Sequence, residues 1–323
     1  MEIFKGDKVF DFMGKSKIFI SISIAFILAS YVLLATKGLN YGLDFKGGTL
    51  VQVQYEHKAP IKKIRESISK DSLFKNASIT KFGSPNEIII KFTTSSSSVK
   101  EDMGDKIGKL LKGTGKFKIR RVDIVGPKVG SELREKGFMA MVLSIISILI
   151  YVAIRFEWRF AVASVAALVH DVSISIGAIA LFQIDVNLDT LAAILTIMGY
   201  SLNDTIIVFD RIREGIHETK KYDLFHVIND SISKTLSRTT LTSLTTFFVV
   251  LTLYLFGGEI IVGFSFTLLI GIIVGTYSSI FVASPLLKWF GFNIEDFKRR
   301  LAEKEKAKAE KEKMREMYER GMV

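Results

Sequence analysis

The chain has 323 residues, of which 49% are hydrophobic, and it carries a formal net charge of +11 without any cysteine. The lack of cysteine excludes disulfides, thiol catalysis and Cys-ligated metal centres. The basic residues form no stripe interleaved with aromatic residues, so the charge does not indicate nucleic-acid binding. The hydrophobic residues gather in long runs such as 18–35 and 260–287. About 20 apolar residues cross a bilayer core of roughly 30 Å, so a membrane protein is favoured over a soluble enzyme.

Six runs are predicted to span the membrane, as an all-α bundle. A tail over residues 1–17 precedes the first span, and a polar segment at 37–136 separates that span from a five-helix bundle at 137–287. A charged tail covers residues 288–323. The first span could be a cleaved signal sequence, but it is long for that role and no small-x-small cleavage site follows it. The spans are expected at 18–36, 137–154, 160–182, 188–209, 239–256 and 260–287.

The basic residues predict the orientation of these spans. Short loops on one side contain Arg155, Arg159, Arg211 and Arg213, whereas the two short loops on the other side contain no Lys or Arg. Because Lys and Arg in short loops stay in the cytoplasm, both termini are predicted to be cytoplasmic. We therefore expect a multi-pass protein of the cytoplasmic (inner) membrane, with residues 37–136 outside.

The extracytoplasmic segment is predicted to be a small α+β domain. Strand patterns occur at 50–55, 77–82, 87–92 and 116–124, with a Gly-Ser-Pro-Asn turn between the middle two. Helical patterns follow Pro60 and the serine run 95–98. The order βαββαβ is that of a ferredoxin-like domain, whose free sheet face would be either a docking surface or part of a structural lid. The segment has no arrangement typical of a catalytic site, and we do not expect an enzyme.

Ionisable residues inside membrane spans are costly and therefore mark candidate functional sites. Asp171 lies near the middle of the third span, beside His170, in a helix rich in Ala, Ser and Gly. It could relay an ion, or it could be a structural group that hydroxyls cap in a buried interface. Asp204 lies in the inner half of the fourth span, and Tyr200 is one turn away on the same helix face.

Arg238 opens the fifth span, ahead of a hydroxyl-rich stretch that begins at Thr239 and suits a hydrated groove. It could be a positive-inside anchor, or it could pair with Asp204. In general, a neighbouring Arg keeps a carboxylate ionised, whereas burial favours the neutral acid. Movement of Arg238 would then let Asp204 take up a proton, which is the hypothesis of a proton-coupled switch. The chain has no phosphate-binding loop of an ATPase, so any work is expected to be ion-driven.

Several motifs together carry a resemblance to a known family. They are Gly-Leu-Asp-Phe-Lys-Gly-Gly at 42–48, Val-Gly-Pro-Lys-Val-Gly-Ser-Glu-Leu at 125–133, His-Asp-Val at 170–172, Gly-Tyr-Ser-Leu-Asn-Asp-Thr at 199–205, Asp-Arg-Ile-Arg-Glu at 210–214 and Ser-Arg-Thr at 237–239. Through these motifs, which are spread over nearly the whole chain, the sequence resembles the SecF branch of the SecD/SecF family, within the resistance-nodulation-division (RND) superfamily.

The resemblance implies an accessory subunit of the Sec protein translocase, which couples the proton motive force or a sodium gradient to late export of an unfolded polypeptide. It implies SecD as partner, association with the SecYEG channel and often YajC, contact with membrane lipid, and no cofactor beyond the transported H⁺ or Na⁺. Because SecD is not fused to this chain, half of the ion pathway is expected from the partner. The implied relay pair is Asp204 and Arg238, ranked ahead of Asp171, with supporting polar groups His170, Tyr200, Asn203 and Thr239.

Two glycine-containing links join the first and second spans to the outer domain. Glycine suits unusual backbone dihedrals and close approach, and Gly126-Pro127 should stiffen the return to the bundle. The links could transmit helix movement to the domain, or they could be only tight turns. Their motif residues are Gly42, Asp44, Gly47, Gly48, Gly126, Pro127 and Gly130.

Two other functions compete with an ion-driven motor. An RND-type small-molecule exporter should carry large outer domains that form a substrate pocket, and a domain over residues 37–136 is small for that. A passive scaffold would not require Asp204 in a hydroxyl-lined environment.

Overall fold

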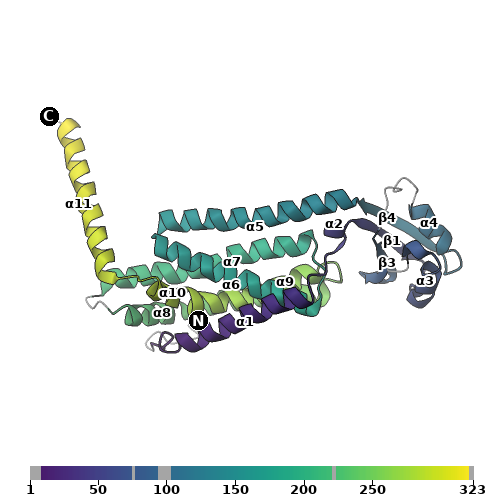
Figure 1. Ribbon diagram of the computed structural model, residues 1–323, viewed down its shortest axis with the longest axis horizontal. Helices are drawn as coiled ribbons and strands as arrows, with labels where there is room; N and C mark the ends of the chain where they lie inside the picture. Colours follow the sequence, from purple (N-terminus) through teal and green to yellow (C-terminus); the bar gives the residue numbers. More distant parts are fainter. Residues whose placement is uncertain (1–8, 75–76, 94–102, 220–222, 320–323) are drawn as a thin grey trace.

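The computed structural model describes residues 9–74, 77–93, 103–219 and 223–319, and the predicted serine run at 95–98 lies outside these ranges. The molecule is elongated, with a small sheet domain at one end and a helical bundle in the middle (Figure 1). The first described residues and the base of the C-terminal helix both lie at the end of the bundle opposite the sheet.

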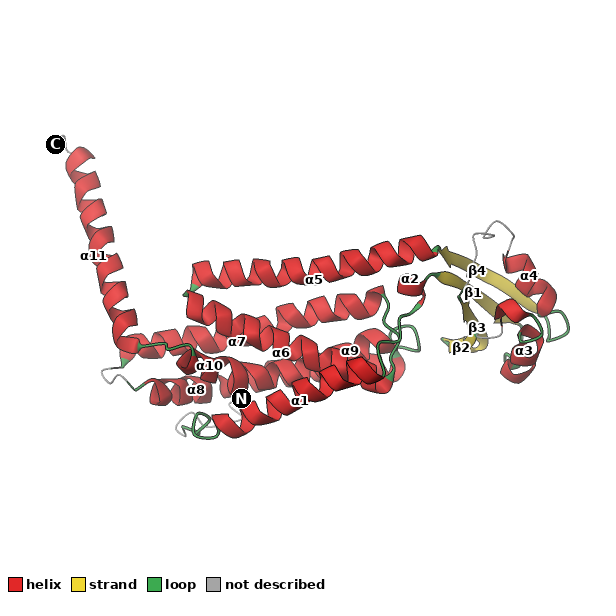
Figure 2. Cartoon of the chain, in the orientation of Figure 1, coloured by secondary structure: helices red, strands yellow, loops and turns green. Residues whose placement is uncertain are grey.

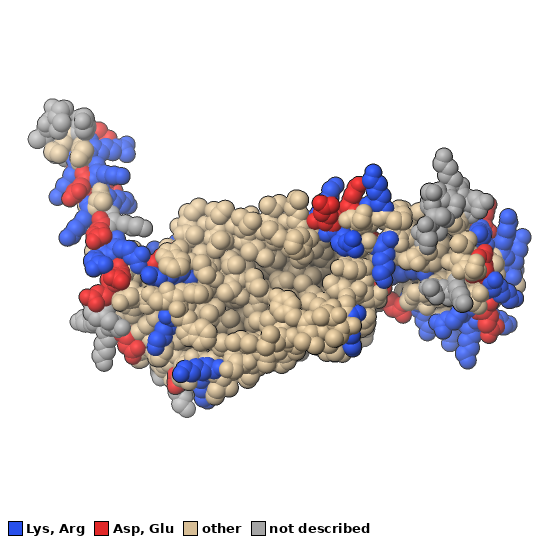
Figure 3. Space-filling model, viewed as in Figure 1, with Lys and Arg blue, Asp and Glu red and all other residues tan. Residues whose placement is uncertain are grey.

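Within the described residues, six helices are long and apolar enough to cross a membrane, as the sequence predicted. On the face shown in Figure 3, charged side chains gather toward the two ends, and the surface of the bundle between them has few charged side chains. An apolar belt of this kind is typical of a multi-pass membrane protein. The spans are α1 (Ser16–Thr36), α5 (Pro127–Arg155), α6 (Trp158–Phe182), α7 (Leu188–Glu218), α8 (Leu224–Phe256) and a last span in which α9 (Val262–Ser278), the π-helical turn η2 (Ser279–Ala283) and α10 (Ser284–Trp289) follow one another.

Three of these helices extend beyond the predicted spans. Helix α5 begins at Pro127 rather than at 137, α7 ends at Glu218 rather than at 209, and α8 begins at Leu224 rather than at 239. The prediction followed apolar character, and the polar turns of these helices carry no such signal. Pro127 suits the first turn of α5, where the missing N–H would have no helical partner.

Glycines on α9 bring it close to α7. A Cβ atom added at Gly271 would lie 2.2 Å from side-chain carbons of Ile197, and one added at Gly275 would lie 3.0 Å from Cβ of Ser201. Small residues allow this approach in membranes, where dispersion rather than the hydrophobic effect holds helices together. The glycine face of α9 therefore lies directly against α7.

We call the sheet domain the outer domain, the end of the bundle next to it the outer end and the opposite end the inner end, after the orientation predicted from the sequence. The outer domain contains an antiparallel four-stranded sheet with the order β2-β3-β1-β4. The alternate residues Val51, Val53 and Tyr55 of β1 are buried with Ile64 and Ile107 of the two helices. The predicted bounds of the turn before β3 were wrong, because β3 already starts at Ser84; the pairing with β2 is irregular there, since Lys81 pairs with Ile88 but Phe82 pairs with Ser84. The elements, in chain order (Figure 2), are α2 (Leu43–Lys46), β1 (Gly48–Tyr55), α3 (Ile61–Ile68), η1 (Ser72–Phe74), β2 (Ser78–Phe82), β3 (Ser84–Phe92), α4 (Met103–Leu110) and β4 (Phe117–Val125).

The charged tail forms helix α11 (Ile294–Glu319), which projects away from the bundle (Figure 1). Its base is anchored: Ile294 and Phe297 are buried in the core at the inner end of the bundle, and Lys298 Nζ donates to the Thr219 carbonyl at 2.6 Å. The sequence predicted a charged tail here, and its described part is helical over Ile294–Glu319.

Candidate ion-relay site

The carboxylate of Asp204 lies inside the bundle, between α7, α8 and α9. Asp204 is 1% exposed, and its Oδ2 accepts a hydrogen bond from Ser243 Oγ of α8 at 3.2 Å. Ser243 Oγ in turn accepts one from Thr276 Oγ1 of α9 at 2.7 Å. The other carboxylate oxygen, Oδ1, is buried and has no partner among the described residues. Asp204 therefore keeps one oxygen available to a proton, a cation or water.

Two more buried hydroxyls on the same helices lack partners. Tyr200 lies one turn before Asp204 on α7, and Thr239 lies one turn before Ser243 on α8. Within the described part of the chain, neither hydroxyl oxygen has a hydrogen-bond partner. Buried polar groups are normally paired, with protein or with ordered water. Unsatisfied groups on two adjoining helices therefore fit a hydrated path beside Asp204.

Arg238 does not contact Asp204. It is exposed, and it lines a groove of about 820 Å³ between the inner ends of α7 and α8, together with Asp210, Glu214 and Lys234. Across the ranges that the structure describes, no nitrogen–oxygen distance within 4.0 Å joins Arg238 to Asp204. The ion pair suggested by the sequence is therefore not formed in this state.

Asp171 is fully buried on α6 and is surrounded by hydrogen-bond donors. Its Oδ1 lies 2.8 Å from His170 Nδ1, and its Oδ2 accepts hydrogen bonds from Ser201 of α7 and, at 2.8 Å, from Ser278 of α9. These are the hydroxyl caps that the structural alternative for Asp171 required. His170 also stacks on Tyr277, with ring centroids 6.1 Å apart, so the cluster joins α6, α7 and α9.

We expect Asp171→Ala to destabilise the bundle. The substitution leaves Ser201, Ser278 and His170 without their shared acceptor, and each buried group left unpaired costs about 1–3 kcal/mol. The midpoint of thermal unfolding in detergent, followed by tryptophan fluorescence, should fall by several degrees. Asp189→Ala, which removes an exposed acid from the outer end of α7, should change it little. An unchanged midpoint combined with lost transport would instead identify Asp171 as a relay group.

The remaining predicted polar group, Asn203, does not join the site. It is exposed on α7, on a face that also carries Ala192, Thr196 and Gly199, whereas Asp204 points into the bundle.

The sequence analysis did not predict Ser201, Thr276 and Ser278 as hydrogen-bond partners around the two buried acids. The hydroxyl run at 276–279, inside an otherwise apolar span, was the signal that could have identified the last two.

The first glycine-containing link lies against the loop between α6 and α7. Gly42 N donates to the Val186 carbonyl at 2.9 Å, and Asp44 Oδ2 accepts the N–H of Leu188 at 2.9 Å. Asp44 therefore caps the first turn of α7, where unpaired N–H groups attract a carboxylate. From the outer domain, Lys91 Nζ lies 3.9 Å from Asp185 in the same loop.

The two links also contact each other. Gly47 has a φ of +77°, and a Cβ added there would lie 2.8 Å from backbone atoms of Pro127. One turn along α5, a Cβ at Gly130 would lie 3.0 Å from Gly47 N and from the Phe45 carbonyl. Gly48 approaches the Phe92 carbonyl of β3 in the same way, whereas Gly126 has open space around it. The outer domain is thus joined to the bundle through close backbone packing.

Comparisons with known proteins agree on one family. Residues 106–293 match the model for protein export membrane protein SecD/SecF, C-terminal, and residues 32–59 match that for the SecD/SecF GG motif. The chain is 48% identical to a protein translocase subunit SecF from Helicobacter pylori, over the full length of both. It is 39% identical to one from Escherichia coli O157:H7, over 94% of each.

A solved structure is similar along most of the chain. The crystal structure of SecDF, a translocon-associated membrane protein from Thermus thermophilus, matches with 35% identity and a TM-score of 0.77 over 89% of this chain. A second crystal structure of SecDF, in the super-membrane-facing form, matches with 34% identity and a TM-score of 0.67. The present chain spans about two fifths of these solved chains, since it covers 39% and 40% of them.

Proposed function

The chain belongs to the SecD/SecF family of protein export membrane proteins, and we propose that it acts as the SecF-type accessory subunit of the Sec protein translocase. In this role it carries an ion across the membrane and uses the released energy to help an unfolded polypeptide leave the channel on the outer side. It is a transport component rather than an enzyme. Relatives that carry the name of a translocase subunit favour protein export over the export of small molecules.

The observation that carries the ion-coupling proposal is the half-paired carboxylate of Asp204. A carboxylate with one free buried oxygen can bind and release H⁺ or Na⁺. The unsatisfied hydroxyls of Tyr200, one turn before Asp204, and of Thr239, one turn before Ser243, suit the same path. Arg238, in the groove at the inner end, supplies the cation that pairs with Asp204 in another state of the cycle. Each elementary charge that moves down the membrane potential releases about 2.3 kcal/mol of free energy per 100 mV.

A SecD partner is supported by the exposed face of α7. Ala192, Thr196, Gly199 and Asn203 are exposed at membrane depth. Small and polar residues suit packing against another helix better than contact with lipid. We assign this face to SecD, and the SecYEG channel and YajC to more distant contacts.

The orientation of the chain in the cytoplasmic membrane belongs to the same proposal. Both described ends lie opposite the sheet domain (Figure 1), which supports cytoplasmic termini and an outer sheet domain. The strand order β2-β3-β1-β4 with antiparallel pairing supports a ferredoxin-like class for that domain. Its role would be to hold the exported chain.

Purification from native membranes tests the assembly. SecD and the channel subunits should co-elute with the tagged chain, whereas co-elution with an outer-membrane exporter channel would contradict the proposal.

Sealed vesicles that contain the chain with SecD test the coupling. An imposed membrane potential should drive H⁺ or Na⁺ flux above that of protein-free vesicles.

A further inference from the structure

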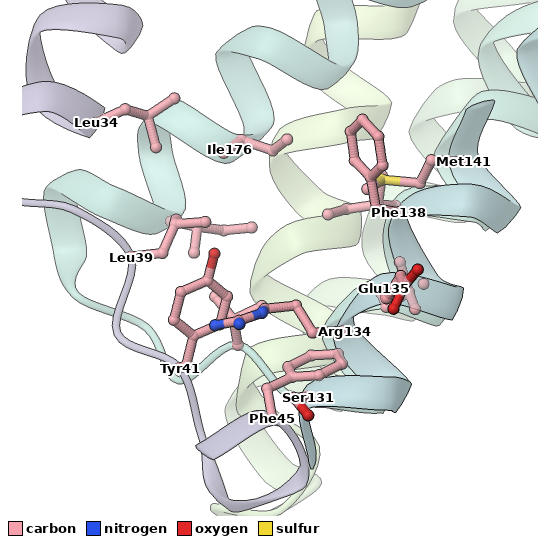
Figure 4. Close-up of a pocket in the computed structure, with 15 residues that line it drawn as sticks. Leu34, Leu39, Tyr41, Phe45, Ser131, Arg134, Glu135, Phe138, Met141 and Ile176 are labelled. Atoms are coloured by element: carbon pink, nitrogen blue, oxygen red, sulfur yellow. The ribbon is translucent and has the colours of Figure 1, made fainter. Parts of the chain in front are cut away.

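A large apolar cavity lies at the outer end of the bundle, away from the relay site. Its volume is about 650 Å³, and residues of α1, α2, α5, α6, α7 and the segment before α2 line it (Figure 4). Mostly apolar pockets of about 300–1,000 Å³ are typical of sites for small ligands. An empty void of this size would forgo many dispersion contacts. Its walls include Leu34, Leu39, Phe45, Phe138, Met141 and Ile176.

The cavity lies at the depth of the outer half of the bilayer. Leu34 is in the last turn of α1, Ile179 is in the last turn of α6, and Leu191 is in the first turn of α7. The adjoining surface of α5 is apolar and is not covered by other helices, since Phe138 is 66% exposed and Met139 is 54% exposed. The face in Figure 3 is hollowed between α5 and α1 at this level. The cavity therefore opens toward acyl chains rather than toward water.

A cation lies at the mouth of the cavity. The guanidinium of Arg134 lies over the ring of Tyr41, 5.5 Å from its centroid (Figure 4). Among the described residues, Arg134 has no carboxylate or carbonyl partner, and the neighbouring Glu135 does not pair with it. A guanidinium binds phosphate through two parallel hydrogen bonds. The mouth therefore offers an anion site directly above an apolar chamber.

We propose that this cavity binds a phospholipid of the outer leaflet, with an acyl chain in the chamber and the phosphate on Arg134. The positive charge of Arg134 and the position of the cavity in the outer half of the bilayer favour a phospholipid over other ligands. Inorganic phosphate would leave the apolar walls empty, and a hydrophobic polypeptide segment would bring no anion to the guanidinium. The bound lipid contacts α1, α5 and the first link together, at the junction between the bundle and the outer domain.

Native mass spectrometry of the full chain, purified with its SecD partner, tests the proposal. With dioleoyl phosphatidylglycerol as the probe, one lipid should remain bound under conditions that strip the others. Arg134→Gln should weaken binding by at least about tenfold, as for the loss of a charge-assisted contact. Lys136→Gln, which removes an exposed charge two residues away on α5, should leave binding unchanged. Ile176→Trp should fill the chamber and abolish binding, and Met141→Trp serves as a second filling variant in case the first misfolds.

Two further probes separate the possible sources of the ligand. Dioleoylglycerol, which lacks phosphate, should bind at least tenfold more weakly, and inorganic phosphate should not displace the lipid. Equal binding of both lipids, or equal effects of Arg134→Gln and Lys136→Gln, would overturn the role of Arg134. A complex that retains no lipid, or that holds a polypeptide segment in the cavity, would overturn the proposal itself.

Discussion

Asp204→Asn is expected to reduce ion flux to the level of protein-free vesicles and to abolish ion-driven export. Asparagine has nearly the same shape, and its carbonyl oxygen can still accept the hydrogen bond from Ser243. It cannot bind and release a proton, however, and it carries no charge for a cation or for Arg238 to meet. Burial of a neutral group is also less costly than burial of a charge, so the variant should fold and assemble. The measurement is flux in sealed vesicles under an imposed potential, alongside copurification with SecD.

Asp189→Asn is the matched control, because it removes the same charge from the same helix at an exposed position. It should retain flux close to that of the unmodified chain. Full flux in Asp204→Asn would remove Asp204 from the relay, and loss of the partner in that variant would indicate misfolding instead. Repeating the assay without sodium separates the two coupling ions, since proton coupling survives the exchange and sodium coupling does not.

Helix α9 links the two buried acids. Thr276 belongs to the hydrogen-bond chain of Asp204, and Ser278, two residues later, donates to Asp171. The close approach at Gly271 and Gly275 holds this stretch against α7, and the π-helical turn η2 follows directly. Such turns are common at functional sites, because they alter helix register locally. A shift of α9 would therefore change both carboxylate environments together.

The features that depend on local pattern were predictable from the sequence. Runs of apolar residues predicted the six spans, and alternation predicted the four strands, because both signals lie in consecutive residues. Buried acids could be chosen as candidates because charge in a span is costly wherever it points. Which partner each acid meets depends on helix rotation and packing, so Ser278 beside Asp171 and the outward-facing Asn203 could not be predicted. The separation of Arg238 from Asp204 likewise reflects one conformation of two helices.

In the link between the outer domain and the bundle, too, the local features were predictable from the sequence and the long-range contacts were not. The glycines at 42–48 predicted either close approach or a turn, and the structure has both at Gly47, with its φ of +77° against the backbone of Pro127. The contact with Gly130 joins residues that are far apart in the sequence, and no local pattern indicates it. Because backbone rather than flexible side chains meet there, the junction tolerates little adjustment.

Gly47→Ala is therefore expected to loosen this junction and to impair export strongly. The backbone of Gly47, at φ +77° and ψ +156°, lies in a region that is almost restricted to glycine, so alanine costs about 1–3 kcal/mol there. The added Cβ would also lie 2.8 Å from Pro127 Cα, so α2 or the start of α5 must move. Hydrogen exchange should rise in peptides that cover 43–47 and 127–133, while SecD still copurifies.

Gly38→Ala separates the clash from backbone strain. Gly38 also has a positive φ, +68°, but a Cβ there would meet no atom within 4 Å. Alanine at 38 should therefore carry only the conformational penalty of about 1–2 kcal/mol, with hydrogen exchange at 127–133 unchanged and export largely retained. If Gly38→Ala and Gly47→Ala impaired export equally, contact with α5 would not be what transmits movement. If instead only Gly47→Ala uncoupled export while ion flux continued, the junction would be the mechanical link between the relay and the outer domain.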